Sequence, residues 1–265
     1  FDTSKTKSAQ FSGNLNIQGA EPGQAFRVSY EGQGSHENGA FDLSAKTKIL
    51  DTDVMLDARS VDGKTFYLKL YGLDSQFLAD AGAGATASLY TPIITAINGQ
   101  WVEIGSSLVQ QITGQQFKGG QPLSKSDQQK LLDIFGKHNF LKVAEVLPNE
   151  TISGAKSSRF KVVIDAAGLK AFAAALKNAG LESIKLTGEQ LQSFNKSVDR
   201  AKFDKYPLEV WISKKDKVIT QIAFKTSEDG AIMDFKFTLN NYNKPVKVEK
   251  PTGAKPLLEL LNSDQ

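Results

Sequence analysis

Residues 41–49 read Phe-Asp-Leu-Ser-Ala-Lys-Thr-Lys-Ile and hold the pattern that decides the fold. Phe41, Leu43, Ala45, Thr47 and Ile49 occupy every second position, and charged or hydroxylated side chains fill the positions between them. Successive side chains of a β-strand point to opposite faces of a sheet. A period of two therefore predicts a strand with one buried face and one solvated face.

The first third of the chain repeats this pattern. We expect a meander of five antiparallel strands at residues 11–18, 26–31, 39–49, 54–61 and 65–71, with a polar turn at 32–39. Asp62-Gly63 separates the last two strands, and Asn38-Gly39 marks the turn before the third. Such pairs are typical of primed hairpin turns, in which both central residues need positive φ.

The rest of the chain mixes helices with further strands. Helices are predicted at 106–112, from Ser126 onward, at 166–179 and from Thr187 onward, with a terminal helical turn at 256–261. Ser126 with Gln129, and Thr187 with Gln190, have the spacing of a capping box. Strands are predicted at 100–104, at 140–147 and 156–164 across a link at 148–155, and at 207–213, 218–226 and 231–240.

These elements predict an α+β fold. About ten or eleven strands and four or five helices follow one another without a clean linker, so we expect one domain over residues 1–265. Helices that fall between groups of antiparallel strands disfavour a doubly wound nucleotide fold. Long strands with one apolar face need a cover, and helices are the available material. The expected architecture is a highly curved antiparallel sheet with the helices filling its hollow.

The composition excludes several kinds of chemistry. The chain has 265 residues and no cysteine, which excludes thiolate metal sites, iron–sulfur clusters, disulfides and cysteine nucleophiles. His36 and His138 are isolated, so we expect no tightly held transition metal and no cofactor. The 32 basic and 29 acidic residues are spread evenly, which predicts no nucleic-acid partner.

The sequence also bears on the cellular compartment. It lacks an apolar run of about 18 residues that could span a bilayer. Because it begins at Phe1 rather than Met, we expect the encoded precursor to carry an export signal or an N-terminal membrane segment.

Catalytic motifs are weak throughout. Residues 82–87, Gly-Ala-Gly-Ala-Thr-Ala, match a loose dinucleotide-binding pattern, but they follow a polar segment in an antiparallel context, which favours a loop. Residues 153–156, Ser-Gly-Ala-Lys, have the spacing of some acyl-enzymes without their supporting elements, and they fall in a predicted β-turn. A non-enzymatic protein is the expectation.

The remaining signal is the amount of apolar side chain on the strands and helices. Either these faces pack on one another, as most such faces do, or sheet and helices leave an apolar pocket for an acyl chain. The sequence leaves both alternatives open. The candidates for lining such a pocket are Phe41, Leu43, Leu56, Phe66, Leu68, Leu70, Ile94, Leu108, Phe160, Val162, Val210, Phe224, Phe235 and Phe237.

Three phrases near the C-terminus form a further pattern. They are Tyr-Pro-Leu-Glu-Val-Trp-Ile-Ser at 206–213, Lys-Val-Ile-Thr-Gln-Ile at 217–222, and Phe-Lys-Phe-Thr-Leu-Asn-Asn-Tyr-Asn-Lys-Pro-Val at 235–246. They resemble the C-terminal strands of the LppX/LprG lipoprotein family, and residues 7–13 and 99–104 also fit its pattern.

This resemblance implies a half-open β-barrel of the LolA/LppX type, whose hydrophobic cavity holds lipid acyl chains. Members act outside the cytoplasm, usually tethered by a lipidated N-terminal cysteine. This sequence departs from the family in two ways: it has no cysteine, and the N-terminal helix expected before the first strand is missing or cut short, because ten residues precede Phe11.

We therefore expect a non-enzymatic extracytoplasmic module of a bacterial cell envelope that binds acyl chains of lipids or lipoproteins, for carriage or envelope assembly. Its expected partners are a lipid or acylated ligand and, through an anchor, a membrane; a monomer is expected. The alternative is a cell-surface structural or signalling module that binds a protein partner with the same fold. An unrecognised hydrolase is the third hypothesis.

Overall fold

A computed structural model describes residues 6–19, 25–49, 52–73, 94, 98–105, 125–181, 186–201, 203, 205–228, 230–257 and 259–260. The chain divides into two compact units. We call Asp2–Pro122 with Ser227–Gln265 the meander unit, and Leu123–Thr226 the helix unit. The expectation of one domain over 1–265 stays a prediction.

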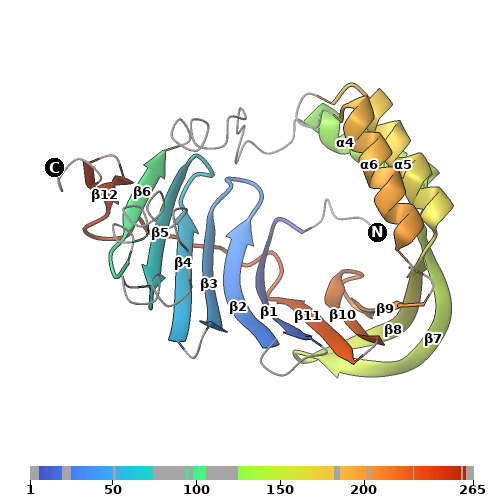
Figure 1. Cartoon of the computed structure of the whole chain (residues 1–265), viewed down its shortest axis with the longest axis horizontal. Helices are drawn as coiled ribbons and strands as arrows, with labels where there is room; N and C mark the ends of the chain where they lie inside the picture. Colours follow the sequence, from blue (N-terminus) through green and yellow to red (C-terminus); the bar gives the residue numbers. More distant parts are fainter. Residues whose placement is uncertain are drawn as a thin grey trace. The chain divides into compact units, whose positions relative to one another are not determined.

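The meander unit begins with the five antiparallel strands that the sequence predicts (Figure 1). They are β1 (Ser8–Gln18), β2 (Ala25–Ser35), β3 (Phe41–Ile49), β4 (Thr52–Ser60) and β5 (Thr65–Tyr71). The short predicted strand is β6 (Val102–Gly105), which pairs with β5. On the opposite side, β11 (Ala231–Asn240) pairs with β1, so the last long strand of the chain lies beside the first.

The register of these strands separates an apolar face from a polar face. One row across β1 to β4 consists of Leu15, Val28, Thr47 and Val54. The next row, on the opposite face, consists of Asn14, Ser29, Lys46 and Met55. Because the pattern has a period of two in every strand, the rows alternate along the whole meander. The main members of the apolar face are Phe11, Leu15, Ile17, Val28, Tyr30, Phe41, Leu43, Leu56, Phe66, Leu68, Leu70, Val102, Ile104, Phe235, Phe237 and Leu239.

A C-terminal strap, residues 241–254, runs across the polar face from the end of β11 to β6. Near its start, Ser8 Oγ donates to the Lys244 carbonyl at 2.6 Å. Near its end, Lys250 Nζ donates to Glu103 Oε2 at 2.9 Å. The strap leads into β12 (Lys255–Pro256), which pairs in parallel with β6. It therefore ties the middle of the sheet to its edge.

Beyond β12 the chain reaches the apolar face. Leu257 and Leu260 lie in a helical turn and pack with Val102 of β6 in a buried cluster. Leu70 and Ile104 pack against this cluster. The predicted terminal turn is confirmed for Leu257 and Leu260, but Pro256 lies in β12 rather than at the first position of the turn.

The helix unit contains four antiparallel strands and three helices. The strands are β7 (Leu141–Ile152), β8 (Ala155–Ile164), β9 (Leu208–Ser213) and β10 (Ile219–Glu228), in the pairing order β7-β8-β9-β10. The helices are α4 (Lys125–Lys137), α5 (Ala166–Asn178) and α6 (Gly188–Arg200), and they lie against one another (Figure 1).

Specific contacts fix the helix ends. The capping box predicted at Thr187 is confirmed: its hydroxyl accepts from the Gln190 backbone N–H at 3.1 Å, and the Gln190 side chain accepts from the Thr187 N–H at 2.9 Å. Phe135 of α4 and Phe172 of α5 both contact Phe140, with ring centroids 5.5 and 5.1 Å from it. These rings join two helices to the start of β7.

The twelve described strands pair in the order β12-β6-β5-β4-β3-β2-β1-β11-β10-β9-β8-β7, and the two end strands do not pair with each other. The prediction of an α+β fold on an open antiparallel sheet is confirmed, with slightly more strands than expected. That the helices fill a hollow of the sheet stays a prediction.

The predicted link at 148–155 is wrong, because the two strands continue to a tight turn. Ser153 and Gly154 form its centre with φ values of 47° and 82°. Positive φ at both central residues matches the right-handed twist of a hairpin. The longer β7 includes Pro148, which is tolerated because β7 is an edge strand among those described and need not donate there.

The primed turn predicted at Asp62-Gly63 is also wrong. Four residues separate β4 from β5, and of the pair Gly63 alone has a positive φ, of 72°. The Asp62 carboxylate instead accepts from the backbone N–H groups of Lys64 and Thr65 at 2.9 and 3.0 Å. A side chain that bonds the backbone nearby offers a different turn to the same Asp-Gly sequence.

Three further differences concern the ends of a strand, a turn and a helix. β2 continues to Ser35, so the predicted turn at 32–39 is shorter than expected. Asn38 lacks the positive φ of a primed turn, which Gly39 has at 71°. α4 begins at Lys125, which places Ser126 inside the first turn rather than at the cap. The predicted helix at 106–112 and the glycine-rich stretch at 82–87 lie outside the described residues.

Candidate functional site

The apolar face of the meander unit gathers eight of the candidate residues. They are Phe41, Leu43, Leu56, Phe66, Leu68, Leu70, Phe235 and Phe237. Phe41 of β3 and Phe66 of β5 meet above the buried Ser60 of β4, with ring centroids 6.1 Å apart. The side chains of three strands thus form one continuous surface.

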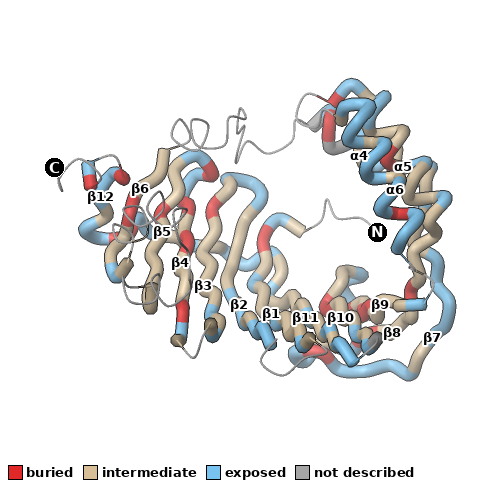
Figure 2. The backbone as a smooth tube through the Cα atoms, viewed as in Figure 1, coloured by how far each residue is buried: buried red, intermediate tan, exposed pale blue. Residues whose placement is uncertain are grey.

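The strands that carry this face contain both buried and partly buried residues (Figure 2). At the β6 edge, Val102 and Leu257 are 0% and 2% exposed. On β2 and β11, away from that edge, Phe26 and Met233 are 40% and 38% exposed. The eight candidate residues of this face are half-buried. The described residues therefore bury one edge of the apolar face and leave its remainder partly accessible.

An aromatic floor lies on the part of the apolar face formed by β11, β1 and β2. The Phe237 ring stacks on those of Phe11 and Tyr30, with centroid distances of 6.2 and 6.3 Å. Phe11 lies over Gly32 and Tyr30 over Gly13: a Cβ at either glycine would come within 2.6 Å of the Cζ atom of the ring above it. Two glycines thus allow the rings to lie flat on the backbone.

The floor adds residues that the sequence reasoning missed. Phe11 and Tyr30 were absent from the candidates, and the available signal was their place in the alternation of the predicted strands at 11–18 and 26–31. Tyr30 Oη donates to the Lys236 carbonyl at 3.4 Å, and burial raises the pKa of this phenol. The Tyr30 ring therefore forms part of the apolar surface, while its hydroxyl is hydrogen-bonded to the backbone of β11.

The helix unit holds four other candidates, Phe160, Val162, Val210 and Phe224. Phe160 pairs with Val210 in register, and both Val162 and Val210 are buried. Phe224 packs edge-on against Tyr206, with ring centroids 6.3 Å apart. These residues form the apolar side of the four-stranded part of the sheet. Of the last two candidates, Ile94 is helical and half-buried, and Leu108 lies outside the described residues.

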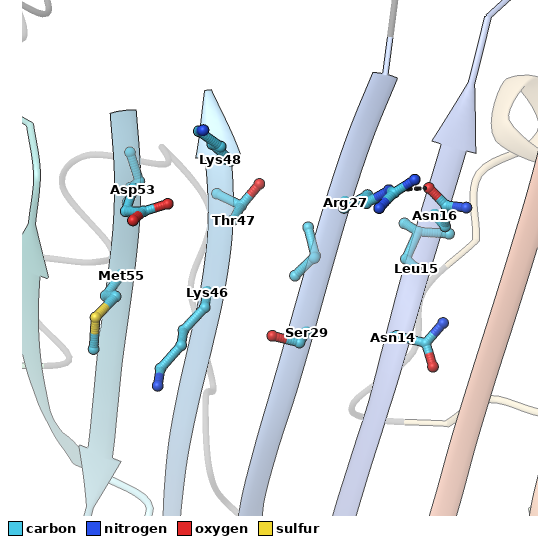
Figure 3. Close-up of a pocket in the computed structure, with 12 residues that line it drawn as sticks. Asn14, Leu15, Asn16, Arg27, Ser29, Lys46, Thr47, Lys48, Asp53 and Met55 are labelled. Carbon is cyan, nitrogen blue, oxygen red and sulfur yellow. Dashed lines mark hydrogen bonds between the residues drawn. The ribbon is translucent and has the colours of Figure 1, made fainter. Parts of the chain in front are cut away.

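A hollow of about 790 Å³ lies on the polar face of the meander unit, on the side of the sheet opposite to the candidate residues. It is built on β1 to β4, and Figure 3 shows its polar side chains, among them Arg27, Lys46, Lys48 and Asp53. A neighbouring hollow of about 520 Å³ involves the same four strands nearer the strap. None of the candidate residues lines either hollow.

The described residues offer little for catalysis. His36 Nδ1 lies 3.0 Å from the Lys7 carbonyl, at the end of β2. Within the described ranges, no three His, Asp or Glu side chains come together as metal ligands. Tyr67, which is buried on the polar face, has its pKa raised by burial and by the Glu103 carboxylate. Lys250 of the strap lies over its ring, 5.5 Å from the centroid, which points to a structural role.

A search of the helices in the described part of the chain found none whose length and apolarity would let it cross a bilayer.

Comparison with known proteins gives similar folds but no close relative. No protein-family model and no curated protein sequence matches the chain. The LppX lipoprotein of Mycobacterium tuberculosis is similar over 93% of this chain and 92% of its own, with 11% identity and a TM-score of 0.39. MucB, solved in complex with MucA(peri), is similar over 94% of this chain and 57% of its own, with 7% identity and a TM-score of 0.31.

A third similar structure is a DUF1329 family protein from Desulfovibrio piger, which covers 92% of this chain and 89% of its own with 10% identity and a TM-score of 0.25. LppX belongs to the family that the sequence resembles. The identities and TM-scores of these three structures are too low to indicate a function for this chain.

Proposed function

We propose that this chain is a non-enzymatic extracytoplasmic module that binds the acyl chains of a lipid or lipoprotein on the apolar face of its meander unit. The observation that carries the proposal is the apolar surface on seven adjacent strands, of which one edge is buried by described residues. A contiguous apolar surface that stays partly accessible is typical of a binding site or an interface.

The chemistry of the face fits a hydrocarbon chain. Leu43, Leu56 and Leu68 offer aliphatic contacts, and the aromatic floor offers flat ones. Burying a methylene group contributes about 0.8 kcal/mol, so ten methylenes contribute about 8 kcal/mol. That is the free energy of a micromolar Kd before the cost of ordering the chain. The eight candidates of this face are accordingly proposed as acyl contacts, and those of the helix unit as further contacts.

The proposed role is carriage of the acylated ligand or assembly of a cell envelope, with the module held at a membrane by an N-terminal anchor. The first experiment is native mass spectrometry of the purified protein, with organic extraction of bound material. The second is titration of the delipidated protein with a fluorescent fatty acid. We expect extracted lipid and a saturable signal with a Kd in the micromolar range or below. Absence of both would contradict the proposal.

A protein partner is the second candidate, and the edge strand β7 favours it. Val143 and Val146 of this strand are 59% and 71% exposed, which is unusual for valine in a sheet. An edge strand also presents unpaired backbone groups to which a partner strand can bind. If lipid titration is negative, a partner whose binding is abolished by Val143→Glu with Val146→Glu would establish this function instead.

A further inference from the structure

The chain's own C-terminal segment occupies one end of the apolar face. Leu257, Leu260 and Val102 of β6 form a cluster in which they are 2%, 9% and 0% exposed. Leu70 and Ile104, which are half-buried, pack against this cluster. Leu70 is one of the proposed acyl contacts, so the C-terminal leucines and the proposed acyl surface meet at its side chain. An inference about this boundary rests on the proposed function.

The covered end is also the end of a row of residues that crosses the sheet. Residues directly opposite each other on paired strands share a face. From β1 to β6, the members of this row are Phe11, Gly32, Leu43, Ala58, Leu68 and Val102. Adjacent strands lie about 4.8 Å apart, so the row is about 24 Å long. A hydrocarbon chain that lies along it meets the C-terminal leucines at Val102 and cannot continue beyond β6.

Contacts around the edge of β6 fix the position of this segment. On the polar face, Lys250 Nζ donates to Glu103 Oε2 at 2.9 Å. The turn that follows contains Gly253, whose φ of 74° a glycine adopts without strain. The next strand, β12, pairs in parallel with β6. Because Leu257 directly follows this paired strand, its place on the apolar face is set by the backbone.

The chemistry of the covered end distinguishes the two ends of a fatty acid. The side chains of the cluster and of its two neighbours are all aliphatic. A carboxylate or phosphate buried among them would have no side-chain hydrogen-bond partner, at a large cost in free energy, whereas a terminal methyl group meets no such cost. On β2 and β11, away from this end, Phe26 and Met233 are 40% and 38% exposed, so a head group there can remain in water.

We propose that Leu257 and Leu260 form an end wall of the acyl site. This end wall receives the terminal methyl group of the bound chain, and the head group lies toward β1 and β11. The ligands are therefore acyl chains up to a defined length, and the two leucines set that length.

The test measures affinity as a function of chain length. Delipidated protein that carries a fluorescent fatty acid is titrated with saturated fatty acids from octanoate to docosanoate. Each added methylene should raise the affinity about fourfold until the methyl group reaches the end wall, and longer chains should gain nothing more. Leu257→Ala opens the wall and should move this limit to longer chains. Leu257→Trp extends the wall and should move the limit to shorter ones.

Leu181→Ala is the matched control. Leu181 is also 2% exposed, but it belongs to the helix unit and is not among the proposed acyl contacts. The same substitution there should leave the limit where it is in the unaltered chain. Thermal melting shows whether each variant is folded, and Leu260→Ala tests the same wall at a less buried position.

The outcomes separate the end wall from the proposed function. An unaltered chain that binds none of these fatty acids would contradict the proposed function itself. Binding whose affinity rises steadily through docosanoate would overturn the end wall without the need for any variant. A limit that the folded Leu257 and Leu260 variants do not move would overturn it as well, and in both of these cases the proposed function would stand.

Discussion

The phenyl ring of Phe11 lies directly against Gly32 of the neighbouring strand, so that a Cβ at position 32 would stand 2.6 Å from its Cζ atom. The same Cβ would lie 2.2 Å from the Asp42 carbonyl oxygen, which belongs to the backbone and cannot turn aside. The close approach of ring and strand therefore depends on a residue without a side chain.

Gly32→Ala is expected to destabilise the meander unit by about 1–3 kcal/mol, the usual cost of forcing extra volume into a packed site. Gly34→Ala is the matched control, on the same strand and face, because the nearest atom to its Cβ would be 3.7 Å away. Urea unfolding of both variants checks the difference. Equal effects at the two positions would show that the ring does not rest on Gly32.

Leu68→Trp tests whether the apolar face is available to ligand. Leu68 is half-buried and lies opposite Ala58 and Val102. If an acyl chain occupies the space above it, the indole should displace several methylenes and weaken fatty-acid binding at least tenfold, with little change in melting temperature. Lys69→Trp, on the opposite face of β5, should bind as the unaltered chain does.

Leu68→Trp should behave differently if the apolar face is closely packed. In a close-packed interior, the added volume at position 68 would cost about 1–3 kcal/mol of stability. A Leu68→Trp variant that melts much earlier, from a parent that binds no lipid, would contradict the acyl site.

Thr187→Ala should destabilise the helix unit by about 0.5–2 kcal/mol, since it removes the hydroxyl that caps α6. Thr187→Ser retains that oxygen and is expected to lose much less. Urea unfolding can be followed through Trp211, which lies buried in the same unit. Equal loss in both variants would assign the effect to the threonine methyl group instead.

Tyr67 should make the stability sensitive to alkaline pH. Burial, followed by the charge of Glu103, raises its pKa in the folded state, although Lys250 opposes the shift. The neutral phenol therefore contributes stability that is fully present below the unfolded pKa of about 10 and is lost as the pH rises through the folded pKa. Tyr67→Phe has no proton to lose, so its free energy of unfolding should fall less above about pH 10. Parallel pH profiles for the two proteins would contradict this origin of the effect.

The strands were predictable where one face is apolar and the other solvated. In β3 and β11 the alternation is unbroken, and the predicted bounds agree with the structure within two residues. The Thr187 cap was predictable for a different reason, because both partners of the box lie within one turn of the helix.

Side-chain hydrogen bonds in turns and contacts between distant segments were less accessible to sequence reasoning. The Asp62 side chain replaced the expected turn by bonding two nearby N–H groups. Phe11 and Tyr30 entered the candidate site because glycines lie opposite them on other strands, and a one-dimensional pattern does not show register. The polar hollow was missed because the residues that line it come from four strands, which only the strand pairing brings side by side.

The pairing of β1 with β11 has a consequence for the order in which the protein folds. Ser12 pairs with Thr238, and Ser8 bonds to Lys244 at a separation of 236 residues. During synthesis from the N-terminus, β1 therefore lacks one neighbour until almost the entire chain has been made. The helix unit lies between these segments, and its strand pairs are closer in sequence. Since distant contacts form slowly, completion of the meander unit should be the late step of folding, and truncation after residue 230 should leave β1 as an unpaired edge.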